Sequence, residues 1–270
     1  GTTALQIAAS TVDGDLTLTS GNASGITDTG TVTVGGNLVA TTDANNGVIN
    51  VGTMAVDGTV ALTTNGNGAA TIVNDAGLSF AASTVTGALS ATATTGDITD
   101  SGALAITGAA TFITGATGSN IILDHASNAF SNSVEIKADD GSEAFGNITF
   151  VDSAAIDFAT SAGSNGDLFI NGGTDGAVGG NLSVTATTGN ITDTVALAVS
   201  GTTTLTTSAN DATITLNNTS NSFTGAMTIT TNDSSGTDAD VLIDGGTTAL
   251  QIAASTVDGD LTLTSGNASG

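Results

Sequence analysis

Short runs of alternating apolar and polar residues follow one another along the whole chain. LTLTS at 16–20, TVTVG at 31–35 and LSVTAT at 182–187 show this pattern, and clusters of Gly, Asn and Asp such as TTGN separate the runs. A period of two residues rich in Val, Ile and Thr predicts strands, and the Gly-rich clusters predict turns. Strand starts recur roughly every 8–12 residues. No segment shows the sustained 3.6-residue period of a helix, so we expect an all-β fold.

Two architectures fit many short strands with Gly-rich turns, namely tandem β-sandwiches and a β-solenoid. The chain has eight Phe and no Trp or Tyr, so its inward residues suit a slender core between stacked coils. The absence of Pro suits continuous ladders, and Thr and Asn stack well on themselves. We therefore predict a parallel β-helix, or β-solenoid, of right-handed sense. With ~20 residues per coil and ~4.8 Å between paired strands, a 245-residue repeat would have about 12 coils and span on the order of 60 Å.

The chain contains the same 25-residue sequence twice. Residues 1–25 and 246–270 both read GTTALQIAASTVDGDLTLTSGNASG. A single compact domain has no reason to carry such a duplication. A stretch of a tandem array that is slightly longer than one repeat would carry it, because it includes the start of the next repeat. We interpret residues 1–245 as one full repeat and residues 246–270 as the start of the next. The identity predicts a seamless junction, with the second segment in the coil positions of the first one period later.

Self-similarity continues inside the 245-residue repeat. The segments 14–42, 87–115 and 180–208 match one another, and a fourth copy begins within the second 25-residue segment. The copies start 73, 93 and 79 residues apart. We interpret the unequal spacing as whole turns gained or lost while the phase was kept.

The charge of the chain is strongly one-sided. The formal net charge is −24, the only basic residue is Lys137, and nearly all of the 25 acidic residues are Asp. Asp favours tight turns, so this acid supply fits a fold with many turns. Nucleic-acid binding through phosphate neutralisation is excluded, and no apolar stretch reaches the ~20 residues of a membrane span. The absence of Cys excludes disulfides and thiolate metal sites.

Two segments in the second half of the sequence resemble a known group of proteins. The phrase GNLSVTATTGNITD at 180–193, followed by LNNTSNSFTGAMTI at 216–229, resembles giant bacterial surface proteins of the filamentous-haemagglutinin and β-strand-repeat adhesin type. The resemblance covers most of the chain through the three long copies. In that family a long right-handed β-helix forms a secreted stalk or fibre that projects adhesive regions. The resemblance therefore implies an extracellular location at the bacterial cell surface.

Enzymatic chemistry has few candidate residues. Polysaccharide lyases with parallel β-helices rely on Arg or Lys, and this chain has no Arg and a single Lys. Asp97 with Asp100, and Asp139 with Asp140, imitate a general acid/base pair. We expect them to be solvated turn carboxylates, and we expect His125 to be a lone surface or turn residue. The sequence therefore predicts no catalytic residues.

Calcium is the one cofactor that the sequence suggests. Two segments, 138–143 and 231–245, concentrate acidic residues, and carboxylate and backbone oxygens are the ligands of Ca²⁺. The candidate metal ligands are Asp233, Asp238, Asp240, Asp244, Asp139 and Asp140. Neither segment matches an EF-hand loop. The other interpretation is diffuse screening by divalent cations, which would allow stacked repeats to bundle laterally.

Two Asn–Phe pairs recur at the same place in successive copies. Asn128 and Phe130 lie 93 residues before Asn221 and Phe223. We expect these four residues to be structural, with side chains that stack inward or cap a turn. The stretch 112–169 also holds six of the eight Phe, which predicts either a thicker core with a longer turn or a lateral contact between fibres.

These observations predict a structural repeat of a long extracellular fibre or adhesin stalk, without enzymatic activity. Its partners would be identical repeats, end to end, in the same chain or in neighbouring protomers. The alternative is a Ca²⁺-dependent adhesin, a binding module that recognises glycans or other cells through its acidic turns.

Overall fold

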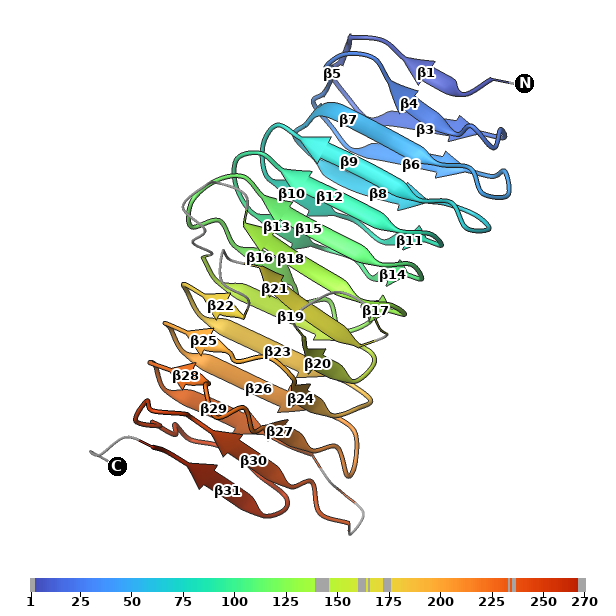
Figure 1. Cartoon of the computed structure of the whole chain (residues 1–270). Coiled ribbons are helices and arrows are strands. Elements are labelled where there is room, and N and C mark those ends of the chain that lie inside the picture. Colours follow the sequence, from blue (N-terminus) through green and yellow to red (C-terminus); the bar gives the residue numbers. More distant parts are fainter. Residues whose placement is uncertain are drawn as a thin grey trace.

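The computed structural model describes residues 3–138, 146–159, 164, 166–171, 176–232, 234 and 237–266. These residues form strands and turns but no helix, and the strands stack into a parallel β-solenoid of about 11 turns (Figure 1). The prediction of an all-β parallel solenoid is confirmed. In this part of the chain, therefore, no helix could cross a membrane.

Three parallel sheets run along the solenoid. The first contains β1 (Leu5–Ile7), β2 (Ser10–Val12), β4 (Ile26–Asp28), β5 (Val32–Val34), β7 (Ile49–Val56), β9 (Ala70–Asn74), β12 (Leu89–Ala93), β15 (Ala110–Thr114), β18 (Val134–Ala138), β20 (Ile156–Phe158), β21 (Asp167–Asn171), β24 (Ile191–Asp193), β27 (Ile214–Leu216), β30 (Val241–Asp244) and β31 (Leu261–Thr264). The second contains β3 (Leu16–Ser20), β6 (Leu38–Thr42), β8 (Thr59–Thr63), β10 (Leu78–Phe80), β11 (Ser83–Val85), β13 (Ile98–Asp100), β14 (Leu104–Ile106), β16 (Ile121–Leu123), β17 (Ala129–Phe130), β19 (Ile148–Asp152), β23 (Leu182–Ala186), β26 (Thr203–Thr207) and β29 (Met227–Thr230). The third contains β22 (Ala177–Val178), β25 (Ala198–Val199) and β28 (Ser222–Phe223).

A regular turn consists of three strands separated by tight corners. β12, β13 and β14 make one turn, β15, β16 and β17 make the next, and each strand pairs in parallel with its counterpart. In β12 the first, third and fifth residues (Leu89, Ala91 and Ala93) are buried, and the two between them are half-buried. Because successive side chains of a strand point to opposite faces, the period-two pattern places Leu, Val, Ile and Ala inside every turn.

The turns differ in length, and most are longer than the ~20 residues that strand spacing alone predicts. Register partners are 19 positions apart between Ala70 and Leu89 and 34 positions apart between Val134 and Leu168. The prediction of about 12 turns in 245 residues is too high, because the whole chain makes about 11 turns. About ten turns remain for 245 residues, which at ~4.8 Å per turn span ~48 Å rather than ~60 Å.

The longest turn contains a strand that is placed out of chain order. β20 precedes β21 in the sequence, yet β21 lies between β18 and β20 in the sheet. Leu168 of β21 accordingly pairs with Val134 of β18 on one side and with Phe158 of β20 on the other. This irregularity falls in the Phe-rich stretch 112–169, so the change in composition coincides with a change in topology.

The sequence copies advance around the solenoid by one side at each step. Each copy begins with a Leu-initiated strand (β3, β12, β23, β31), and in the first three copies an Ile-Thr-Asp strand follows (β4, β13, β24). Three register steps lead from β4 to β12, from β13 to β23 and from β24 to β31. The Leu strand of each copy therefore stacks on the ladder that contains the Ile-Thr-Asp strand of the previous copy.

Successive copies are thus separated by three complete turns plus one of the three sides that make up a turn. The expectation that whole turns were gained or lost between copies while the phase was kept is wrong, because every spacing comprises the same three register steps and one change of sheet. The unequal residue counts come from turns of different length. The Leu strands therefore alternate between the two large sheets, with β3 and β23 in the second sheet and β12 and β31 in the first.

A string of aromatic rings lies in the core. Its members are Phe80, Phe112, Phe130 and Phe150, each at most 2 % exposed. Successive ring centroids are 6.3, 6.1 and 5.2 Å apart, the first two contacts edge-to-face and the third stacked. These are distances at which aromatic pairs attract each other beyond simple burial.

In β26, Oγ1 of Thr203 is the one buried side-chain oxygen without a hydrogen-bond partner among the described residues. Thr203 lies in register between Leu182 and Met227. Because an unpaired buried hydroxyl costs ~1–3 kcal/mol, we expect Thr203→Val to raise the free energy of unfolding by about 1 kcal/mol in urea titrations. Thr207→Val is the control, because Thr207 Oγ1 donates to the carbonyl of Ala212 (3.0 Å) and its loss should be destabilising. Destabilisation by both substitutions would contradict the prediction.

Candidate functional site

Side-chain oxygens of Asp and Asn form ladders along corners of the solenoid. Asp97 Oδ1 accepts the backbone N–H of Asn120 (2.7 Å). Asn120 Oδ1 accepts the N–H of Asn147 (2.7 Å), whose own Oδ1 accepts the N–H of Asn181 (2.9 Å). Each acceptor directly precedes a strand and lies one turn before its donor. Short polar side chains that bind nearby backbone favour such corners, which explains why Asp rather than Glu supplies the charge.

A buried asparagine links consecutive turns in the third copy. Asn221 Oδ1 accepts the N–H of Leu197 (2.7 Å), and Asn221 Nδ2 donates to Asp193 Oδ2 (2.7 Å). The two partners fix the orientation of the amide, because an N–H can only donate and a carboxylate can only accept. Asn221 is 1 % exposed, so both hydrogen bonds lie where water does not compete. We call this arrangement the Asp–Asn clamp.

The second copy contains the same clamp. Asn128 Oδ1 accepts the N–H of Leu104 (2.9 Å), and Asn128 Nδ2 donates to Asp100 Oδ2 (2.6 Å). Both asparagines precede by two positions a fully buried ring, Phe130 or Phe223. The four residues singled out in the sequence thus lie in the interior. The carboxylate partners were missed, although the constant 28-residue separation of Asp and Asn is a signal that could have revealed them.

In the first copy a threonine takes the place of the asparagine. Asp28 Oδ1 accepts the N–H of Gly52 (3.0 Å), and Asp28 Oδ2 accepts both the N–H (2.7 Å) and the Oγ1–H (2.6 Å) of Thr53. The carboxylate that ends each Ile-Thr-Asp strand therefore has the same role in all three copies, which is to hold the backbone of the following turn.

Two of the structural carboxylates are buried. Burial raises the pKa of Asp152 above its usual 3.8, although backbone N–H groups, among them that of Phe130, partly offset the effect. Burial likewise raises the pKa of Asp193, against the hydrogen bond from Asn221, and the nearby Asp157 carboxylate adds to the increase. Both groups therefore favour the protonated form more in the folded than in the unfolded chain.

These raised pKa values predict higher stability in acid for this part of the fold. A carboxyl group whose pKa is higher in the folded than in the unfolded chain stabilises the fold fully at pH values below its unfolded-state pKa. This stabilisation is lost as the pH rises through the pKa of the folded state. We expect Asp152→Asn to raise the free energy of unfolding at about pH 7 and to flatten its pH dependence down to about pH 4. Asn keeps the oxygen that accepts the N–H of Phe130 but carries no charge. Asp75→Asn, at an exposed position, is the control, and equal flattening by both variants would contradict the assignment.

Two of the three candidate calcium ligands that the structure describes accept backbone hydrogen bonds at turns. Asp240 Oδ1 accepts the N–H of Asp260 (2.8 Å), Asp244 Oδ1 accepts the N–H of Gly246 (2.8 Å), and Asp238 is exposed. The other candidates, Asp139, Asp140 and Asp233, lie outside the described residues. Within the described part of the chain, no three or more His, Asp or Glu side chains gather as a metal site would require. A cation at Asp240 or Asp244 would compete with these hydrogen bonds.

The candidate acid/base residues also have local partners. Asp97 belongs to the corner ladder, whereas Asp100 belongs to a clamp and accepts the N–H of Asp124 through Oδ1 (2.9 Å). His125 Nδ1 accepts the N–H of Ser127 (3.1 Å). Asp97 and Asp100 thus hold two different neighbouring segments, and each carboxylate has a structural contact of its own.

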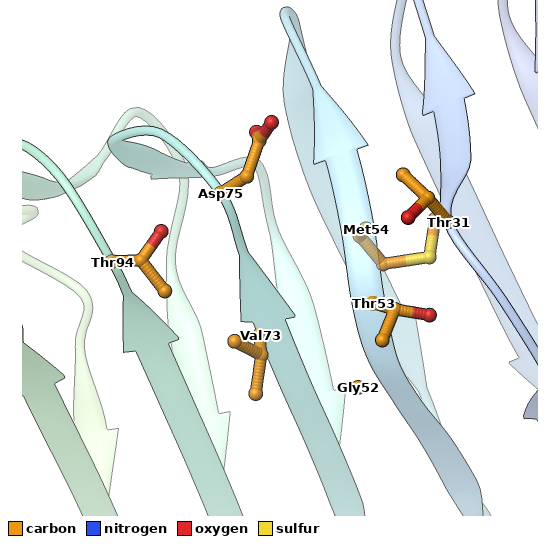
Figure 2. Close-up of a pocket in the computed structure, with 7 residues that line it drawn as sticks. All are labelled: Thr31, Gly52, Thr53, Met54, Val73, Asp75 and Thr94. Atoms are coloured by element: carbon orange, nitrogen blue, oxygen red, sulfur yellow. The ribbon is translucent and has the colours of Figure 1, made fainter.

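A shallow depression of about 260 Å³ lies where β7 is irregular. Its lining residues are Thr31, Gly52, Thr53, Met54, Val73, Asp75 and Thr94, and the Met54 side chain extends toward Thr31 (Figure 2). Thr53 Oγ1 donates to Asp28, and Thr94 Oγ1 donates to the carbonyl of Asn74 (3.0 Å). The depression contains no basic side chain and offers few free polar groups, so it is a poor site for a substrate.

One comparison with known proteins identifies a family. The family model described as "Repeats of unknown function (DUF5649)" matches residues 67–137 and 145–230, more than half of the chain. Each matched segment contains one of the long internal copies, 87–115 or 180–208. No curated protein and no solved structure matches the chain.

Proposed function

The chain belongs to the family of repeats of unknown function DUF5649, and from that premise we propose that it is a structural repeat of a long extracellular fibre or adhesin stalk, without enzymatic activity. The observation that carries the proposal is the identity of residues 1–25 and 246–270 in a solenoid whose strands pair along its axis. Each turn is a template for the next, so a repeat of this kind adds length without adding a new fold.

In this proposal the protein acts mechanically, by resisting force along the solenoid axis. Backbone hydrogen bonds, corner ladders and Asp–Asn clamps all join one turn to the next, so they all lie between turns that tension along the axis would separate. A solenoid pairs every strand except those of its outermost turns, which limits edge-to-edge aggregation. The fibre would therefore act as a stiff spacer that carries other domains away from a surface.

Composition and site geometry support a role without catalysis. The chain has no Arg and one Lys, and the described acid/base candidates Asp97 and Asp100 are bound to backbone or amide groups. The extracellular, bacterial location rests on the resemblance of 180–193 and 216–229 to surface proteins of the filamentous-haemagglutinin and β-strand-repeat adhesin type.

The test is to image the native material by cryo-electron microscopy and to record its diffraction. We expect fibres with a strong layer line at ~4.8 Å and an axial period near 48 Å, the length of ten turns. Isolated globular beads without that spacing would overturn the fibre assignment and favour a tandem-domain adhesin.

The charge of the repeat favours a second candidate, a Ca²⁺-dependent adhesin. A net charge of −24 attracts divalent cations, which would also bring parallel fibres together. We expect millimolar Ca²⁺ to increase light scattering of the assembled protein, EDTA to reverse it, and Na⁺ at equal ionic strength to have little effect. Glycan-array binding that disappears in EDTA would support the adhesin, whereas reversal of scattering alone would support bundling of a structural fibre.

A further inference from the structure

Asn65 and Gly66 lie at an exposed corner of the solenoid, between β8 and β9. Asn65 Oδ1 accepts the backbone N–H of Gly66, the next residue along the chain (2.8 Å). Because a C=O bond is ~1.2 Å long, the Gly66 nitrogen lies at most ~4 Å from Cγ of Asn65. Intramolecular attack is efficient from a separation of ~3–3.5 Å. The folded chain therefore holds a backbone nitrogen close to the carboxamide carbon that it could attack.

The fold requires glycine at position 66. Gly66 has a φ of 70°, in the left-handed region that favours glycine. A Cβ atom at this position would also collide with Oδ1 of Asn45 in the preceding turn. Glycine hinders attack on the preceding side chain less than any other residue, because it has no Cβ. The requirement of the fold thus coincides with the requirement of the chemistry.

Two other Asn-Gly pairs lie within the described residues, at 46–47 and 67–68. In these pairs the glycine N–H donates to a backbone carbonyl, that of Ala44 (3.0 Å) or that of Asn65 (3.2 Å). Both of these glycines are buried, whereas Gly66 is exposed. Of the three pairs that the structure describes, only 65–66 therefore turns a solvent-accessible N–H toward the carboxamide of its own asparagine.

Asn132 makes the same contact in a less reactive setting. Its Oδ1 accepts the N–H of Ser133 (2.8 Å). Ser133 carries a Cβ next to its nitrogen and is 2 % exposed, so both sterics and burial oppose attack. The contact at Asn65 is combined with a following glycine and with access for water.

Asn65 joins its corner to the corner of the preceding turn. Its Nδ2 donates to the carbonyl of Asp43 (3.1 Å), and its own backbone carbonyl accepts the N–H of Asn46 (2.9 Å). A carboxylate at position 65 has only acceptor oxygens, so it cannot replace the bond from Nδ2. In isoaspartate the main chain runs through Cγ, and the carbonyl that Asn46 contacts becomes part of a free carboxylate. Either product of deamidation would weaken the contact between the two turns.

We propose that Asn65 is a site of spontaneous deamidation directed by the fold, and that the product loosens the contact between corners 43–48 and 64–69. Hydroxide removes the amide proton of Gly66, and the nitrogen attacks Cγ of Asn65. The new N–Cγ bond displaces Nδ2, which takes a proton from water and leaves as ammonia, so hydroxide is regenerated and a succinimide ring remains. Water then opens the ring at either carbonyl and gives aspartate or isoaspartate. This modification does not depend on the proposed fibre function.

The test is to incubate the full folded chain in mildly alkaline buffer and to digest it with a protease that cleaves before aspartate. The digest places Asn46 in peptide 43–56 and both Asn65 and Asn67 in peptide 57–74. New cleavage before position 65 reports aspartate, and an uncleaved 57–74 peptide with the mass of an acid reports isoaspartate, which fragment spectra assign to its position. We expect Asn65 to react several-fold faster than Asn46 and Asn67. Equal or slower reaction at Asn65 would overturn the proposal.

Two controls separate the fold from the local sequence. In guanidinium chloride the three pairs lose their different structures, so their rates should converge, and a persistent preference for Asn65 would overturn the role of the fold. In Asn65→Gln, which can close only a larger and less favourable ring, the signal in peptide 57–74 should fall to that of Asn67. A signal that stays at the wild-type level would overturn the assignment to Asn65.

Hydrogen exchange tests the structural consequence in the converted chain. We expect a several-fold loss of protection at the N–H of Asn46, which donates to Asn65. The N–H of Thr64 is the internal reference, because it donates to the carbonyl of Thr84 in the following turn (2.9 Å) and should keep its protection. Unchanged protection at Asn46, or equal losses at both sites, would overturn the proposed loosening of this contact.

Discussion

Phe112→Ala is expected to lower the free energy of unfolding by ~3–5 kcal/mol, because it removes the ring that contacts both Phe80 and Phe130. Phe112 is fully buried, and the solenoid turns on either side hold their backbones in fixed ladders. The walls around the missing ring can therefore relax little, and most of its volume should remain as a cavity. Urea unfolding and native-state hydrogen exchange in β12, β15 and β18 would measure the loss.

Phe169→Ala is the matched control for this prediction. Phe169 pairs in register with Glu135 on the outward-facing side of β21 and is half-buried. We expect its removal to cost well under half as much as removal of Phe112. Equal losses for both variants would show that the aromatic string contributes no more than ordinary apolar area.

Asn221→Asp is expected to cost on the order of 3–5 kcal/mol at neutral pH, because it replaces the donor of the clamp by a second carboxylate beside Asp193. Much of that loss should be recovered near about pH 4, where the two carboxylates can share a proton. Thermal unfolding across this pH range would record both effects, and hydrogen exchange would report lost protection at the N–H of Leu197.

Asn217→Asp is the control for charge alone. Its side chain is exposed, and only its backbone N–H contacts Asp193. It introduces the same charge four residues away, and we expect a change of about 0.5 kcal/mol or less. A loss as large as that of Asn221→Asp would mean that net charge, rather than the clamp, limits stability.

The sequence was sufficient to predict the architecture of this protein. The alternation of LTLTS or LSVTAT requires one buried face, and a chain without Pro, Trp or Tyr cannot easily build anything but a slender stack. The length of the turns was not predictable in the same way. Corner loops and the insertion of β21 between β18 and β20 depend on which strands pair, and strand pairing is decided by contacts between distant segments.

The candidate sites were only partly predictable. The recurrence of Asn128 and Asn221 before a Phe marked them as structural, but nothing local distinguishes Asp193 from the many exposed aspartates. Its role appears only when the fold brings it within 2.7 Å of Asn221. Burial of Asp152 is hidden for the same reason, because the residues that cover it come from neighbouring turns.

The advance of one side per copy has a consequence for the material that such repeats would form. Successive copies place their Leu strands alternately on the two large sheets. If every copy fell on the same side, any softness in one strand type would give the rod a single plane of easy bending. Alternation between the two large sheets removes that single plane, because neither sheet carries the Leu strand of every copy.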